Sequence, residues 1–154
     1  MDTLETDNME PVISIERNYT SGITPLVTIV LPCYNYAGYL PGAVQSIADQ
    51  TFQDFEVIIV NDGSTDNTLE VAREILDKYR GELCITLVDQ ENRGHPSITK
   101  NTGYSYAKGK YCFTLDSDDM IRPDYVEKTV DVLEKHPDVD VVYPGYQTII
   151  TSKS

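Results

Sequence analysis

At residues 110–119 the sequence reads Lys-Tyr-Cys-Phe-Thr-Leu-Asp-Ser-Asp-Asp. Its apolar half predicts a buried strand, and the strand ends in three carboxylates within four positions. Because side chains alternate along an extended chain, Asp116 and Asp118 can point the same way. Carboxylates this close repel one another, so they favour a bound cation. Hard oxygen ligands without His or Cys nearby suit Mg²⁺ or Mn²⁺ better than zinc. The same residues also fit a solvated acidic turn that caps the next helix.

Two earlier apolar runs end in polar residues in the same way. The run at 26–31 stops at Pro32 and continues into Cys33-Tyr34-Asn35, and the run at 55–60 leads into Asn61-Asp62-Gly63-Ser64. β-Branched residues dominate both runs, which is typical of strands in a parallel sheet. Since ligands on such sheets bind beyond the carboxyl ends of the strands, we expect all three polar clusters to line one edge. Three such clusters favour a binding site over a purely structural domain.

The segments between these runs have apolar residues at helical spacing. The resulting alternation predicts an α/β fold with a mostly parallel central sheet and helices on both faces. Strands are expected at 26–31, 55–60, 83–88, 111–115 and 139–143, and helices near 40–47, 69–79, 96–107 and 123–133.

The first 24 residues differ from the rest of the chain. They carry five carboxylates against a single arginine, with few apolar residues. We therefore expect residues 1–24 to be an acidic, flexible leader that could contain a short docked segment. Residues 25–154 are expected to form the folded domain.

The composition is that of a single globular domain, with 154 residues of which 40% are hydrophobic and 24% charged. The formal net charge of −13 argues against binding to nucleic acid or an anionic membrane, because both need a basic face. A small phosphorylated ligand stays compatible if a metal neutralises it. With no secretion signal and no apolar run of about 20 residues, we expect a cytoplasmic protein; membrane association would need segments outside this chain.

Several other classes of site are disfavoured. Neither a P-loop nor a dinucleotide-binding glycine motif follows the first predicted strand. A calcium loop starting at Asp116 fails because Met120 and Ile121 occupy positions that need an oxygen ligand and a glycine. The only two histidines, His95 and His136, belong to no visible Ser-His-Asp set, and His95 is expected to be a loop residue.

Individual side chains near the expected edge have alternative interpretations. Asp62 can accept a hydrogen bond from a nucleotide base, or it can form an Asx turn. Tyr34 can stack on a planar ring or simply pack. Asn92, Arg93 and Lys100 can contact a diphosphate, although Lys100 also fits a solvated helix face.

Read together, these residues resemble the family 2 glycosyltransferases of the GT-A fold, which is Rossmann-like. The resemblance runs from about Leu26 to Gln147. It rests on five segments in order: Val27-Thr28-Ile29-Val30-Leu31-Pro32-Cys33-Tyr34-Asn35, Ser46-Ile47-Ala48-Asp49-Gln50-Thr51-Phe52, Val60-Asn61-Asp62-Gly63-Ser64-Thr65-Asp66, Asn92-Arg93-Gly94 with Lys100-Asn101-Thr102-Gly103, and Leu115-Asp116-Ser117-Asp118-Asp119.

The resemblance implies binding of a nucleoside-diphosphate sugar, with a UDP-sugar the expected form. Pro32, Tyr34 and Asn35 would then shape the nucleoside pocket, and Asp62 would recognise the base. The family transfers the sugar with inversion to a hydroxyl acceptor, here an unknown glycan or lipid, and uses a downstream carboxylate as the base.

The resemblance also implies a metal site. Asp116 would lie near the ribose and the metal, and Asp118 would be the main protein ligand to Mn²⁺ or Mg²⁺. Lys100 would take part in donor binding, at a position where the family usually has arginine, so a point charge replaces a bidentate fork.

The resemblance covers only the donor-binding part of the family. Its acceptor-binding half and its catalytic base are expected beyond Ser154. One alternative is therefore a non-catalytic half-domain that needs a partner chain, and the exposed truncated face would favour self-association. A nucleotidyltransferase-like enzyme is a further alternative, but no glycine-rich basic loop follows the first predicted strand.

Overall fold

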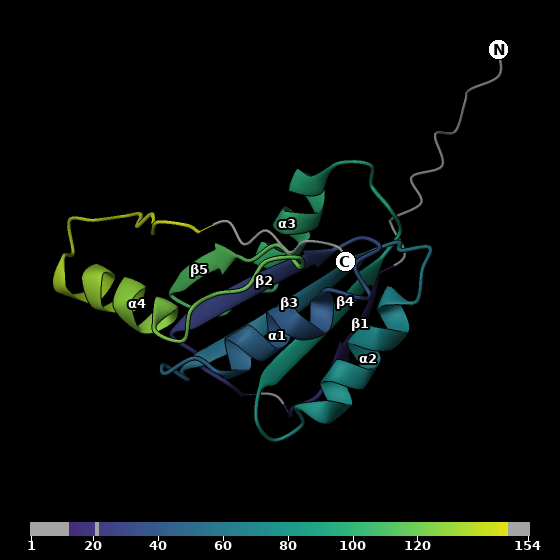
Figure 1. Ribbon diagram of the computed structural model, residues 1–154, viewed down its shortest axis with the longest axis horizontal. Helices are drawn as coiled ribbons and strands as arrows, with labels where there is room; N and C mark the ends of the chain where they lie inside the picture. Colours follow the sequence, from purple (N-terminus) through teal and green to yellow (C-terminus); the bar gives the residue numbers. More distant parts are fainter. Residues whose placement is uncertain (1–12, 21, 148–154) are drawn as a thin grey trace, which may run out of the picture.

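The computed structural model describes residues 13–20 and 22–147 (Figure 1). Strands and helices alternate through most of this part of the chain. The strands are β1 (Ile13–Arg17), β2 (Val27–Cys33), β3 (Phe55–Asp62), β4 (Cys84–Gln90) and β5 (Tyr111–Thr114), and the helices are α1 (Leu40–Ala48), α2 (Thr68–Lys78), α3 (Pro96–Ser105) and α4 (Tyr125–Lys135).

The strands form one sheet in the order β1-β4-β3-β2-β5. The four strands from β2 to β5 run parallel, whereas β1 pairs antiparallel with β4. Every residue of β3 is buried, as expected for a central strand covered on both faces. The predicted α/β fold, with its mostly parallel sheet, is confirmed.

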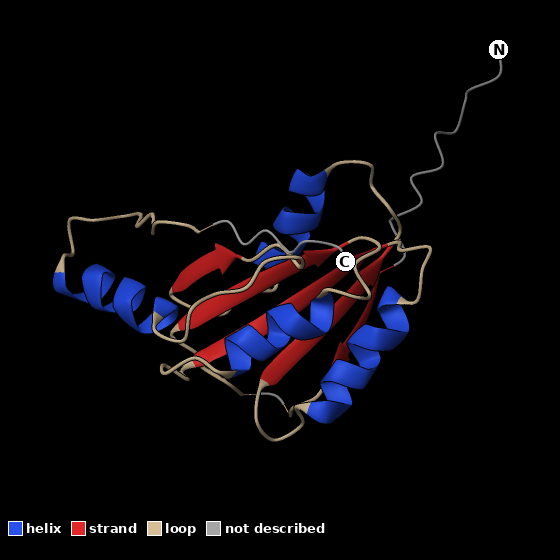
Figure 2. Ribbon diagram, in the orientation of Figure 1, coloured by secondary structure: helices blue, strands red, loops and turns tan. Residues whose placement is uncertain are grey.

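Helices cover both faces of the sheet (Figure 2). Alternate residues of β2 face opposite ways, so Ile29 and Leu31 join the large core under α1 and α2. Val30 faces the other side and belongs to a smaller cluster beside the end of α3. At Gly103 of α3, an added Cβ would lie 2.3 Å from Val30 Cγ1, so the helix lies unusually close to the sheet.

A buried carboxylate directs the chain into β5. Glu56 is 1% exposed, and its Oε1 accepts hydrogen bonds from Thr28 Oγ1 at 2.7 Å and from the Lys108 backbone N–H at 2.7 Å. Thr28 Oγ1 in turn accepts a hydrogen bond from Gly109 N at 2.9 Å. These bonds join β2, β3 and the turn before β5, so they fix where the strand that leads to the acidic stretch begins.

The strands differ from the expected ones in two places. Residues 13–17 lie within the expected leader, for which a short docked segment was allowed, and they form β1, because their backbone pairs with β4 and gives the sheet an antiparallel edge. Residues 139–143, expected as the fifth strand, form no strand, and Tyr143 is 90% exposed. That segment pairs with no strand of the sheet among the described residues. The leader up to residue 12 lies outside the described residues.

Candidate functional site at the carboxyl ends of the parallel strands

A cavity of about 530 Å³ lies where the parallel strands end. Its size is typical of small-molecule sites. Its lining comes from the segments after β2, β3 and β5 and from the loop and first turns of α3, as expected for an open α/β sheet. The lining residues are Pro32, Cys33, Tyr34, Tyr36, Asp62, Asn92, Gly94, His95, Pro96, Thr99, Lys100, Asp116, Ser117 and Asp118.

Asp62 lies at the end of β3 and is held from one side. It is 6% exposed, and its Oδ1 accepts hydrogen bonds from Gln90 Nε2 at 2.9 Å and from the Arg93 backbone N–H at 3.4 Å. Gln90 ends the neighbouring strand β4, so the sheet register brings these two side chains together. Arg93 therefore contributes its backbone here, and its side chain does not line the cavity.

The turn after Asp62 brings two loops into contact. Gly63 has a φ of +64°, and a Cβ at this position would lie 2.5 Å from the Asn92 backbone nitrogen. Only glycine fits both the left-handed backbone and the close approach. The turn at Gly63 is thus the place where the loops after β3 and β4 meet.

Asn35 occupies a different place from the one expected. It does not line the cavity, and its polar atoms bind the loop before α2. Asn35 Oδ1 accepts hydrogen bonds from the backbone N–H groups of Thr65 at 2.8 Å and Asp66 at 3.2 Å, and the Asn35 backbone N–H donates to Ser64 Oγ at 3.0 Å. The φ of Asn35 is +55°, a conformation that asparagine tolerates better than most residues. Its contacts therefore connect the segments after β2 and β3 rather than reach into the cavity.

Ser117 anchors the acidic stretch to the end of β2. It is fully buried, its Oγ donates to the Pro32 carbonyl oxygen at 2.8 Å, and the same Oγ lies 2.8 Å from Cys33 Sγ. Burial raises the pKa of the Cys33 thiol to about 12, so this group stays neutral. With Ser117 turned inward, the neighbouring Asp116 and Asp118 are left exposed at the cavity.

The carboxylates of this stretch influence one another. Desolvation, and then the charges of Asp118 and Asp116, raise the pKa of Asp119 above its ordinary value. Lys100 Nζ lies 3.8 Å from Asp116 Oδ1, so the lysine from α3 and the acidic stretch face each other across the cavity. This exposed ion pair is weak by itself and leaves both groups accessible to a ligand.

Several lining residues were missed or underrated from the sequence. His95 was expected to be only a loop residue, but it lines the cavity while its Nδ1 accepts a hydrogen bond from Ser97 N at 3.2 Å and caps α3. Tyr36 and Thr99 were not proposed as site residues. Thr99 carried a usable signal, because it precedes Lys100 on the same first turns of α3.

The donor atoms at the acidic end are carboxylate oxygens. No group of three or more His, Cys, Asp or Glu side chains gathers in a metal-binding arrangement within residues 13–20 and 22–147. Mg²⁺ and Mn²⁺ are commonly held by one or two carboxylates together with substrate phosphates and water. Two exposed aspartates beside a cavity therefore fit such an ion better than they fit a complete protein cage.

A mostly parallel sheet with a polar cavity at its strand ends defines an α/β ligand-binding domain, open at the edge where phosphorylated ligands commonly bind. The family model described as "Glycosyl transferase family 2" matches residues 28–153, and this chain belongs to that family. The resemblance stated from the sequence is thereby confirmed.

Two curated relatives illustrate the match. The chain is 36% identical over 124 residues to "Glycosyltransferase GlyG" of Streptococcus pneumoniae serotype 4, covering 80% of this chain and 40% of that protein. It is 42% identical over 132 residues to "Chondroitin synthase" of Pasteurella multocida, covering 86% of this chain and 13% of that protein. The chain therefore spans less than half the length of either relative.

Solved structures share the GT-A fold. S. aureus TarS 1-349 in complex with UDP-GlcNAc superposes with a TM-score of 0.65 at 31% identity, covering 72% of this chain and 32% of that one. The mannosyltransferase PcManGT from Pyrobaculum calidifontis, in complex with GDP-Man and Mn²⁺, gives a TM-score of 0.66 at 28% identity, with coverage of 71% and 32%. Among the described residues, no helix is long and apolar enough to cross a membrane.

Proposed function

We propose that this chain is the donor-binding part of a glycosyltransferase, which binds a nucleoside-diphosphate sugar together with a divalent cation. One observation carries the proposal: a single cavity has a buried, hydrogen-bonded carboxylate at Asp62 and two exposed carboxylates at Asp116 and Asp118. The Asp62 carboxylate suits a hydrogen bond from a nucleotide base, and the carboxylates of Asp116 and Asp118 suit a metal-bound diphosphate. A UDP-sugar is the expected donor, and a UDP-GlcNAc complex of a neighbouring structure supports this choice.

At the nucleoside end, Asp62 is positioned to accept a hydrogen bond. Its Oδ1 is occupied by Gln90 and by the Arg93 backbone, which leaves Oδ2 for a donor on the ligand. An imide N–H, as in uracil, is such a donor. Tyr34 is 46% exposed beside Pro32 at the same cavity, so its ring is available to cover a planar base.

At the diphosphate end, Asp118 would be the main ligand to Mn²⁺ or Mg²⁺, with Asp116 beside it. The bound cation would stabilise the charge that develops on the leaving diphosphate. Lys100 faces Asp116 and supplies a second positive charge for the phosphate oxygens. A cation is needed here because a chain of net charge −13 would otherwise repel an anionic donor.

The proposed reaction is a transfer with inversion at the anomeric carbon. The bond between that carbon and the diphosphate oxygen breaks, and its electron pair leaves with the nucleoside diphosphate. The acceptor hydroxyl oxygen forms the new bond and gives its proton to a carboxylate base. We assign no residue of the cavity to this base or to the acceptor site. Because the chain spans less than half the length of the relatives named above, we expect little or no transfer by this chain alone.

Calorimetric titration tests the donor site. UDP, GDP and dTDP are titrated with and without Mn²⁺ into the wild-type chain and into the Asp62→Ala and Asp118→Ala variants. We expect one base to be preferred, Asp118→Ala to lose the metal-dependent part of the affinity, and Asp62→Ala to lose the base preference. Asp54→Ala removes one exposed charge outside the cavity and serves as the control. A folded wild-type chain that binds none of the nucleotides would overturn the proposal.

A second candidate is a half-domain that needs a partner chain. Among residues 13–20 and 22–147, β5 pairs with β2 on one side only, and a groove of about 450 Å³ beside it is lined by Tyr104, Tyr111, Phe113, Tyr125 and Tyr143, among other residues. An unpaired edge strand next to aromatic side chains favours association with another surface. We propose that this chain self-associates through the β5 edge.

A further inference from the structure

The ligand roles assigned above do not explain one of the five segments on which the family resemblance rests, Ser46-Ile47-Ala48-Asp49-Gln50-Thr51-Phe52. None of its residues lines the cavity. Gln50 follows the end of α1 and is nevertheless 4% exposed. A buried primary amide has two donors and one acceptor to satisfy, and leaving any of them unpaired is costly. The partners of Gln50 therefore indicate what this segment does.

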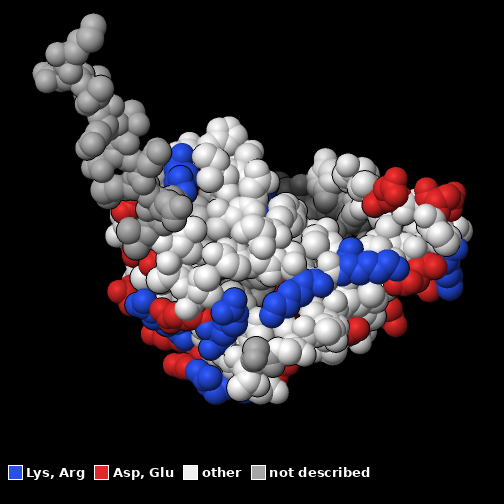
Figure 3. All heavy atoms as spheres, turned by 180° about the vertical axis from the view of Figure 1, so that it is seen from behind, with Lys and Arg blue, Asp and Glu red and all other residues white. Residues whose placement is uncertain are grey.

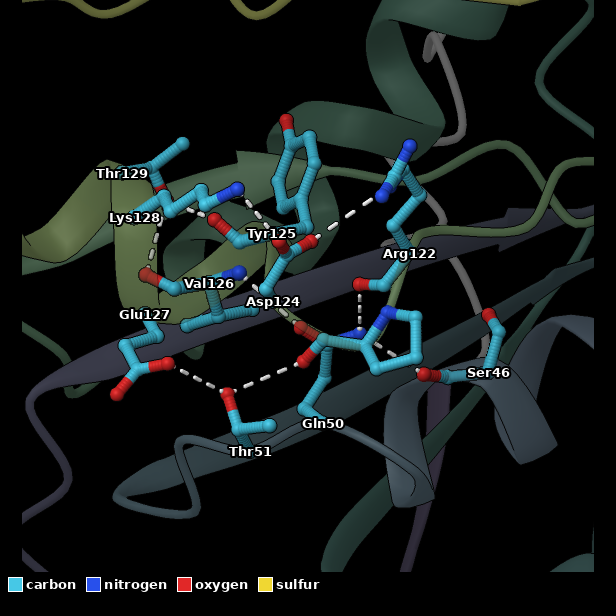
Figure 4. Close-up of polar contacts among 11 residues, drawn as sticks. Ser46, Gln50, Thr51, Arg122, Asp124, Tyr125, Val126, Glu127, Lys128 and Thr129 are labelled. Atoms are coloured by element: carbon cyan, nitrogen blue, oxygen red, sulfur yellow. Dashed lines mark hydrogen bonds and ion pairs between the residues drawn. The ribbon is translucent and has the colours of Figure 1, made fainter.

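All polar atoms of the Gln50 amide are used. Its Nε2 donates to the backbone carbonyl oxygens of Arg122 at 2.7 Å and Ser46 at 3.0 Å, and its Oε1 accepts from the Val126 backbone N–H at 3.0 Å (Figure 4). Two of these partners are backbone atoms on either side of the entry into α4. Gln50 thus fixes the path of the main chain between residues 122 and 126.

Two neighbours of Gln50 extend these contacts along the same chain segment. Ser46 Oγ accepts a hydrogen bond from the Ile121 backbone N–H at 3.2 Å. The Thr51 backbone N–H donates to the Pro123 carbonyl oxygen at 2.8 Å, and Thr51 Oγ1 donates to Glu127 at 2.9 Å (Figure 4). Apart from the local contact between Gln50 and the Ser46 carbonyl oxygen, the backbone atoms that these three side chains contact across the fold lie between residues 121 and 126, directly after the acidic stretch.

The acidic stretch is consequently held at both ends. Ser117 fixes it upstream through the Pro32 carbonyl oxygen, and Ser46 holds Ile121 downstream. The residues between these two anchors, from 118 to 120, are exposed. A short exposed segment between a buried anchor at Ser117 and a half-buried one at Ile121 has little freedom, so the downstream anchor restricts where the Asp118 carboxylate can lie.

We infer that Gln50 and Ser46 form a positioning clasp, which holds the chain after the acidic stretch so that Asp118 faces the cavity in a fixed arrangement beside Asp116. The inference rests on the proposed donor site and adds residues that touch neither the donor nor the metal. Groups that orient metal ligands without touching the metal commonly matter for affinity. The clasp gives a structural role to a serine on α1 and to a glutamine just beyond its end, and both act on the chain that follows the aspartates after β5.

The test uses Gln50→Met, which keeps the length of the side chain and removes its three hydrogen bonds. UDP affinity is measured with and without Mn²⁺. We expect the Mn²⁺-dependent gain to fall by about tenfold or more, while UDP binding without metal is unchanged. Hydrogen exchange measured by mass spectrometry should become faster across residues 116–126. Ser46→Ala loses one contact to residues 121–126, together with a hydrogen bond within α1 to the Ala43 carbonyl oxygen. It should show the same pattern more weakly, and it replaces Gln50→Met if that variant does not fold.

Tyr79→Phe is the matched control. It removes the hydrogen bond from Tyr79 Oη to Gln45 Oε1, on the α2 side of α1, and leaves residues 116–126 untouched. A clasp variant that matches Tyr79→Phe in both the Mn²⁺-dependent gain and the exchange rates would show that Gln50 only stabilises the fold, and would overturn the inference. A wild-type chain without Mn²⁺-dependent binding would instead overturn the donor site itself. The two failures are therefore distinct.

Discussion

At the cavity, one carboxylate oxygen of Asp62 already accepts a hydrogen bond from the Gln90 side chain, which therefore sets how the carboxylate is oriented. Gln90 is 3% exposed, and its Nε2 is the closer of the two donors to Asp62. Its own Oε1 has no hydrogen-bond partner among the described residues. The hydrogen bond from the Gln90 amide therefore orients the Asp62 carboxylate. If Asp62 recognises the base as proposed, a change at Gln90 should weaken nucleotide binding as a change at Asp62 does.

We predict that Gln90→Glu weakens UDP binding. The substitution replaces a donor by a carboxylate beside Asp62, so the two like charges repel and Asp62 loses its side-chain hydrogen bond. A hydrogen bond to a charged group contributes about 1.5–3 kcal/mol, so the affinity should fall by about tenfold or more. Titration with UDP and Mn²⁺ measures the effect. Gln53→Glu makes the same change at an exposed position outside the cavity and should bind like wild type; equal affinities of both variants would contradict the prediction.

The sequence predicted well which residues would lie near one another, and it predicted less well which contacts each side chain would make. Asp62, Asp116 and Asp118 could be placed at one edge because each follows a recognisable strand. The inward position of Ser117 follows from the same alternation, yet its hydrogen bond to Pro32 needs the register of β2 and β5. Asn35 was misplaced because its side chain is satisfied by a loop about thirty residues away in the sequence.

Among the elements, α3 contributes most to the geometry of the cavity. It carries His95 at its N-cap and Lys100 on its exposed side, and it lies against β2 and β3 on the face opposite α1 and α2. Gly103 permits this close packing, since Val30 and Val60 occupy the space that a Cβ would need. The position of Lys100 relative to the strand ends therefore depends on a glycine one turn further along the helix.

We predict that Gly103→Ala destabilises the fold. The new methyl group would lie 2.3 Å from Val30 Cγ1 and 3.3 Å from Val60 Cγ2, so α3 must move away from the sheet. Overpacking of this kind costs about 1–3 kcal/mol, which outweighs the better helix propensity of alanine. Urea denaturation gives the free energy of unfolding. Gly38→Ala is the control, because no atom lies within 4 Å of a Cβ there. An unchanged stability of Gly103→Ala would contradict the close packing.

Sequence patterns predicted the four parallel strands β2 to β5, and failed at the antiparallel edge strand β1 and at residues 139–143. Strands β2, β3 and β4 are apolar runs that need burial on both faces, so their composition alone indicates them. Edge strands have one partner, and their residues need less burial. Residues 13–17 therefore looked like part of an acidic leader, whereas residues 139–143 looked like a strand although they pair with none of the described ones.

At the scale of the whole molecule, the net charge opposes self-association, whereas the edge of β5, which pairs only with β2 among the described residues, favours it. The net charge is −13, and the face in Figure 3 shows a band of Lys and Arg side chains bordered by acidic ones. Repulsion between copies opposes contact, while the aromatic groove beside β5 favours it. The balance between these two effects should depend on ionic strength.

We predict that self-association increases with salt. At about 0.15 M the Debye length is roughly 8 Å, so added salt screens repulsion between copies and leaves apolar contact intact. Light scattering coupled to size exclusion, at low and moderate NaCl, measures the mass. Cys112→Lys places a charge at an exposed position on β5 and should keep the chain monomeric. The control is Glu74→Lys, which changes the net charge more than Cys112→Lys does but lies on α2, away from the β5 edge. This variant should still associate. A monomer under all conditions would refute the β5 interface.

The position of β2 in the sheet has a consequence for the order in which the molecule assembles. β2 lies between β3 and β5, and its contact with the acidic stretch, from Ser117 to Pro32, joins residues 85 positions apart. Closing so long a loop is entropically costly and slows folding. During synthesis, the β2–β3–β4 part can pair while later residues are still being made. Asp116 and Asp118 can then join only after β5, so the acidic end of the cavity should be the last to form and the first to open under stress.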